Sequence, residues 1–156
     1  MKNFIETFNQ GMSVKKLHDE ITLCNDKTSE YGLKLTEEDI TELIKTRSYV
    51  LNKSGRVEFN GEIIDKIIMN FCDSPYISQY NYGDTINELI EIFYNYKNET
   101  MDVIGDDELI EIMKENFDNY CRGSLELLEG KVLYKIAENI RNGVHDYTDI
   151  SQDKDI

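Results

Sequence analysis

The sequence Leu35-Thr36-Glu37-Glu38-Asp39 begins the most clearly defined helix of the chain. Thr36 can cap a helix N-terminus, and the three acidic residues after it occupy the first turn, where the helix dipole is positive. The pattern therefore predicts an amphipathic helix that starts at Thr36 and ends at Gly55. Its apolar residues are Ile40, Leu43, Ile44, Val50 and Leu51.

Apolar residues at helical spacing continue on both sides of this segment. On the N-terminal side, Phe4, Ile5 and Phe8 form a first amphipathic stretch that stops at Gly11, and a second begins after Ser13. On the C-terminal side, four further stripes cover residues 63–71, 86–94, 109–120 and 125–140. Polar loops separate these segments.

This pattern predicts an all-α fold: a compact bundle of six or seven helices with no significant sheet. We expect a single helical domain over residues 3–143 and a flexible acidic tail over residues 144–156. The length of 156 residues suits one domain, and the 40% of apolar residues can fill its core.

The net charge of −14 excludes a basic surface for direct nucleic-acid binding, because Lys and Arg are needed to neutralise phosphates. No apolar run is long enough to span a membrane, and the N-terminus lacks the pattern of a signal peptide. We therefore expect no membrane association and a cytoplasmic location. Most of the excess acid lies beyond the first 55 residues.

The three cysteines, Cys24, Cys72 and Cys121, are odd in number and far apart. A disulfide framework would need an even number, and a zinc site would need close pairs, so we expect small buried thiols. The histidines, His18 and His145, have no Glu three residues before them and lie in no catalytic motif.

An EF-hand frame over residues 118–129 fails because Tyr120 and Arg122 stand where calcium needs short oxygen donors. The sequence thus predicts no catalytic residues, no metal site and no cofactor.

The polar, tyrosine-rich segment over residues 71–82 stands between two strongly amphipathic helices and contains the single proline. Tyrosine offers a large rigid surface with a hydrogen-bonding tip, which is typical of recognition residues. The candidate binding residues are Cys72, Asp73, Tyr76, Tyr80 and Tyr82, with the three tyrosines as aromatic anchors. A simple helix–helix connector, with its tyrosines packed on the bundle, would also explain the segment.

Three stretches, residues 55–59, 71–77 and 106–110, resemble a family of uncharacterised proteins from clostridia-like bacteria, a domain of unknown function. The resemblance spans roughly residues 30–130 and includes Gly123-Ser124-Leu125-Glu126. It implies a bacterial cytosolic setting and brings no catalytic residues with it.

The leading hypothesis is a non-enzymatic acidic helical module that binds another protein through residues 71–82. One alternative is a small-ligand-binding protein or enzyme with an inter-helical pocket near Cys72, Asp73 and Tyr76. Another is an acidic nucleic-acid mimic that uses the acids of residues 84–129. The sequence leaves a homodimer open.

Overall fold

The computed structural model describes residues 13–144, which are all-α and contain no strand, as predicted. The elements are α2 (Val14–Thr28), η1 (Ser29–Tyr31), α3 (Glu37–Ser54), α4 (Glu62–Phe71), α5 (Tyr82–Glu99), α6 (Asp106–Asp118), α7 (Leu125–Leu127), η2 (Leu128–Val132) and α8 (Leu133–Arg141). Of these, η1 is a 3-10 turn and η2 is a π-helical turn. Elements α7, η2 and α8 form one continuous last helix over residues 125–141.

Two expectations fall largely outside the described residues. The stretch around Phe4, Ile5 and Phe8 precedes them, and all of the acidic tail except Val144 follows them. The domain boundaries at residues 3 and 143 therefore stay a prediction.

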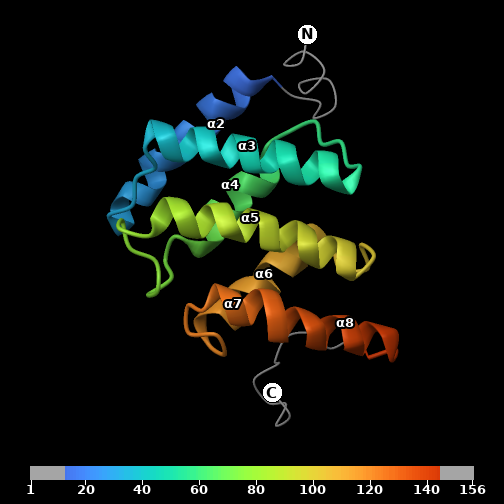
Figure 1. Cartoon of the computed structure of the whole chain (residues 1–156). Helices are drawn as coiled ribbons and strands as arrows, with labels where there is room; N and C mark the ends of the chain where they lie inside the picture. The colour runs from blue at the N-terminus through green and yellow to red at the C-terminus, as the bar shows by residue number, and fades with distance from the viewer. Residues whose placement is uncertain (1–12, 145–156) are drawn as a thin grey trace.

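Helices α3 and α5 form the centre of the bundle and make its most extensive helix–helix contact. Figure 1 shows them side by side, with α2 beyond α3, α8 beyond α5, and α4 and α6 behind them. The side chains between these helices are buried in one continuous apolar core. Each helix therefore buries the apolar stripe that its sequence predicts.

Side-chain caps fix where the first two described helices begin. The Ser13 hydroxyl accepts a hydrogen bond from the Lys16 amide at 3.2 Å. Thr36 and Asp39 form a reciprocal capping box, in which each side chain accepts from the other's backbone amide, at 3.1 and 2.9 Å. Such a cap stabilises a helix by about 1 kcal/mol. Helix α3 ends at Gly55, whose left-handed conformation has φ +67°.

A buried arginine ties the connector between α3 and α4 to the bundle. Arg47 is 1% exposed, and its guanidinium donates to the carbonyl oxygens of Glu58 and Asn60 at 3.1 and 3.0 Å. The Glu58 carboxylate in turn accepts from the Tyr94 hydroxyl at 2.6 Å. Burial lowers the pKa of Arg47 and raises that of Glu58.

Two helix ends differ from the sequence pattern. Residues 25–34 are polar and contain Gly32, a composition typical of a loop, but α2 continues to Thr28, whose hydroxyl donates to the Leu33 carbonyl oxygen at 2.9 Å. Aspartate is a common N-cap residue, which makes Asp106 the natural cap of α6, but Gly105 holds the N-cap position and Asp106 is the first helical residue. The Asp106 carboxylate instead lies 2.8 Å from the Lys97 ammonium.

Candidate functional site

Residues 72–81 form the connector between α4 and α5, so four of the five predicted site residues lie in it and Tyr82 is the first residue of α5. The connector is held by its own polar side chains. The Ser74 hydroxyl donates to Asp118 of α6 at 2.6 Å and accepts from the Tyr76 amide at 3.2 Å. The Asn81 side chain accepts from the Ser78 amide at 2.9 Å and donates to the Tyr76 carbonyl oxygen at 3.1 Å.

A second set of hydrogen bonds attaches the connector to the loop before α3. The Gln79 side chain accepts from the Lys34 amide at 2.7 Å and donates to the Lys34 carbonyl oxygen at 2.8 Å. This amide–backbone pairing joins segments 45 residues apart in the chain. The backbone on both sides of Tyr80 is therefore fixed.

The three predicted tyrosines have very different environments. Tyr80 is 99% exposed, Tyr76 is 38% exposed, and Tyr82 is wholly buried. The Tyr76 ring packs edge-on against Phe117 of α6, with ring centroids 6.3 Å apart. Tyr82 packs in the core, so a partner could not reach it without unfolding. Only Tyr80 and part of Tyr76 face solvent.

Cys72 is also buried, at 5% exposure, and its thiol lies 3.5 Å from the Met69 carbonyl oxygen. Burial raises the pKa of this thiol, and the nearby Asp73 carboxylate raises it further. A thiol with a raised pKa is a poor nucleophile at neutral pH. Cys24 and Cys121 are buried as well, and burial raises the pKa of each to about 12.

Asp73 belongs to a small charge cluster between the connector and α6. The Lys114 ammonium lies 2.6 Å from Asp73 and 3.1 Å from Asp118, which also accepts from Ser74. Burial alone would lower the pKa of Lys114, but its hydrogen bonds to the two carboxylates outweigh this effect and raise it. Asp73 therefore positions the connector and is not a free acid or base.

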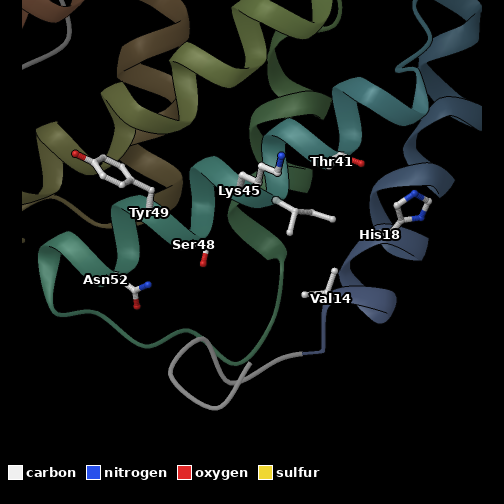
Figure 2. A pocket seen from close by; sticks show the side chains of 8 residues that line it. Val14, His18, Thr41, Lys45, Ser48, Tyr49 and Asn52 are labelled. Carbon is white, nitrogen blue, oxygen red and sulfur yellow. The ribbon is translucent and has the colours of Figure 1, made fainter. Parts of the chain in front are cut away.

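A hollow of about 460 Å³ lies between α2 and α3, away from the connector. Figure 2 shows Val14 and His18 on α2 on one side of it and Thr41, Lys45 and Ser48 along α3 on the other. We call it the α2–α3 groove. Its lining residues are Val14, His18, Thr41, Ile44, Lys45, Ser48, Tyr49 and Asn52.

One end of the groove is closed by a contact between the two helices. The His18 ring nitrogen Nε2 lies 2.7 Å from a carboxylate oxygen of Glu37 in the first turn of α3. No motif in the sequence pointed to this groove. In the fold, Val14 and Tyr49 stay 48% and 61% exposed, which the spacing of apolar residues does not predict.

A second hollow, of about 420 Å³, lies beside the π turn. The buried Tyr96 hydroxyl donates to the carbonyl oxygen of Leu128, the first residue of that turn. Glu99, Glu129 and Arg141 contribute charged groups to the lining. π turns are frequent at functional sites, but the regular apolar spacing of residues 125–140 gave no sign of one.

Among residues 13–144, no group of three His, Cys, Asp or Glu side chains is placed to hold a metal ion. None of the helices described in that range has both the length and the apolar character needed to cross a membrane.

The fold and these surfaces define a small acidic all-α protein. A family model described as a family of unknown function, DUF6323, matches residues 20–146, and the chain belongs to this family. The resemblance seen in the sequence to a domain of unknown function is thereby confirmed. The match includes the whole 71–82 segment and all of α3 but begins after the first six residues of α2. No curated protein and no solved structure matches the chain.

Proposed function

We propose that this protein is a helical module that binds another protein through the connector, with Tyr80 as its aromatic anchor. The observation that carries this function is the contrast between the Tyr80 side chain, 99% exposed, and its two hydrogen-bonded neighbours, Gln79 and Asn81. The aromatic ring of Tyr80 projects into solvent from a backbone that its neighbours hold in place, and the ring makes no contribution to the core.

Such an arrangement favours binding because little has to be ordered when a partner arrives. Binding normally costs free energy to immobilise loops and side chains. Here the connector is already fixed to Lys34 and Asp118, so only the Tyr80 side chain remains to be ordered. Aromatic residues of this kind dominate the energetics of many interfaces.

The net charge of −14 indicates what kind of partner would fit. A basic surface that offers an apolar pocket for one tyrosine ring would be drawn to this chain and then anchored by Tyr80. Tyr76, half-exposed on the same connector, extends the contact surface.

The two alternative functions have weaker support. An enzyme at Cys72 would need a reactive thiol, whereas burial raises the pKa of this one. A nucleic-acid mimic would need a continuous field of unpaired acids, whereas Asp106, Asp107 and Asp118 each lie against a lysine, at 2.8, 2.8 and 3.1 Å. Protein binding is therefore the function that the geometry favours.

We place this activity in the bacterial cytoplasm. Three unpaired, buried cysteines suit a reducing compartment, since disulfides form mainly in oxidising ones.

The test is affinity capture from a bacterial lysate with the full chain and two single variants. Tyr80→Ala removes the proposed anchor, and Tyr134→Ala removes a tyrosine on α8 that is 64% exposed and lies outside the connector. We expect one partner to be retained by the wild type and by Tyr134→Ala, and to bind roughly thirtyfold more weakly to Tyr80→Ala.

Both variants should unfold at the temperature of the wild type, because neither ring is buried. Equal capture by wild type and Tyr80→Ala would exclude the connector as the contact. Equal loss in both variants would indicate nonspecific adhesion of exposed tyrosines and would also count against the proposed function.

A further inference from the structure

Two large side chains that line the α2–α3 groove stay exposed. Val14 is 48% exposed and Tyr49 is 61% exposed, and both lie beside the nearly buried Ile44. The polar lining residues, such as Lys45 and Asn52, are found with them along α3. A surface with apolar residues next to polar ones is what an amphipathic peptide covers.

The chain itself has a segment of matching chemistry. Residues 1–12 include the apolar side chains of Phe4, Ile5 and Phe8, which share one face at helical spacing. The buried core over residues 13–144 is filled by side chains from the six helical segments and the loops of that range.

The described part of the chain begins at the edge of the groove. Residue 12 is followed by Ser13, the cap of α2, and Val14 already lines the groove. From Thr41 to Asn52, the lining of α3 spans about 16 Å at the rise of an α-helix. Twelve residues span about 18 Å even as a helix, so the segment is long enough to cover the groove.

We propose that residues 1–12 fold back into the α2–α3 groove and cover Val14, Ile44 and Tyr49 with Phe4, Ile5 and Phe8. The occupant is thus the same chain, and the groove is an internal docking site.

A photo-crosslinker in the full-length chain tests this docking directly. We would replace Phe8 by p-benzoylphenylalanine, irradiate the protein at low concentration and map the products by mass spectrometry. The expected product is a cross-link within one chain to a residue between Thr41 and Asn52. The same probe at Tyr134, on α8, is the control and should give no cross-link to α3.

The cross-linked products distinguish between the possible occupants of the α2–α3 groove. Cross-links between two chains would show that a second copy fills the groove and would overturn the proposal. Products confined to other parts of the chain, or none on α3, would also overturn it.

A double-mutant cycle gives a second, independent readout in the full chain. Docking predicts that Phe8→Ala lowers the folding equilibrium constant of the wild type about tenfold. In a protein that already carries Tyr49→Ala, the same substitution should lower this constant less than about threefold, because the contact between the two side chains is already lost. Leu23→Ala, at an exposed position of α2 outside the groove, is the matched partner that should show no coupling to Phe8→Ala. Additive effects of Phe8→Ala and Tyr49→Ala would contradict docking.

Discussion

Gly123 lies so close to Tyr76 that an added Cβ atom at Gly123 would stand 2.6 Å from the Cβ atom of Tyr76. The same glycine has φ +85° and donates its backbone amide to the Phe117 carbonyl oxygen at 2.8 Å. Since Tyr76 also packs on Phe117, this contact joins the end of α6 to the connector. Only glycine suits this position, for both its conformation and its size.

We therefore predict that Gly123→Ala destabilises the protein by more than about 2 kcal/mol. The left-handed conformation alone costs an alanine about 1 kcal/mol, and the clash with Tyr76 adds to it. Gly32→Ala is the control, because Gly32 has φ +74° but no atom within 4 Å of an added Cβ. Denaturant unfolding should show a clearly smaller loss for Gly32→Ala, and equal losses would exclude the clash.

Tyr82 and Tyr96 provide a matched pair of buried hydroxyl groups. The Tyr82 hydroxyl makes no hydrogen bond within the described residues, whereas the Tyr96 hydroxyl donates to the Leu128 carbonyl oxygen. Burial raises the pKa of Tyr82 to about 12. An unsatisfied buried hydroxyl is unfavourable, so its removal relieves a cost.

We predict that Tyr82→Phe leaves stability unchanged or raises it by about 1 kcal/mol, while Tyr96→Phe lowers it by about 1–2 kcal/mol. Thermal unfolding of the two variants measures the difference. A large loss in Tyr82→Phe would show that its hydroxyl has a partner after all, such as a buried water molecule.

The contrast between Tyr80 and Tyr82 shows where sequence reasoning stops. Helix starts at Ser13 and Thr36 were predictable because a cap depends on residues within one turn. The exposures of Tyr80 and Tyr82, at 99% and 0%, depend on where α5 begins and on what packs against its first residue. The sequence could therefore identify the segment over residues 71–82 but not which of its tyrosines is exposed.

The α2–α3 groove and the π turn were missed for a related reason. Val14 has an apolar spacing that fits a core position, yet it is 48% exposed because no described element covers that end of α2. Whether two helix faces meet or leave a groove depends on their placement in space, which periodicity does not contain. The all-α fold class could be predicted without knowing how the helices are placed, because the apolar spacing of each helix is contained in its own segment of sequence.

The turn between α5 and α6 contains two consecutive non-glycine residues with positive φ, Met101 at 54° and Asp102 at 59°. Asp102 is held there by Arg56, whose guanidinium nitrogens lie 3.0 Å from both carboxylate oxygens. This hydrogen-bonded pairing lowers the pKa of Asp102. Met101 is 69% exposed, so little packing offsets its unfavourable conformation.

We predict that Met101→Asn raises stability by up to about 1 kcal/mol, because asparagine adopts the left-handed region more readily than methionine. The matched control is Val103→Asn, at an exposed position of the same turn whose φ is not positive. The control should bring no gain. A loss of stability in Met101→Asn would indicate that the methionine side chain contributes packing of its own.

Asp65 gives the protein a defined dependence on pH. Its carboxylate accepts from the buried Cys24 thiol at 3.5 Å, and burial raises the pKa of Asp65 from 3.8 to about 6. The folded state therefore binds a proton more tightly than the unfolded state. The stabilisation from this proton is fully present below about pH 4, falls as the pH rises from 4 to 6, and is absent above about pH 6.

We predict that Asp65→Asn, which is neutral at every pH, is more stable than the wild type at pH 8 and equal to it below pH 4. Because water still reaches part of this side chain, the gain at pH 8 should be on the order of 1 kcal/mol. Chemical denaturation at pH 4, 6 and 8 measures it, with Asp26→Asn on the exposed face of α2 as the control. A difference between wild type and Asp65→Asn that does not change with pH would show that the carboxylate has the same proton affinity in both states.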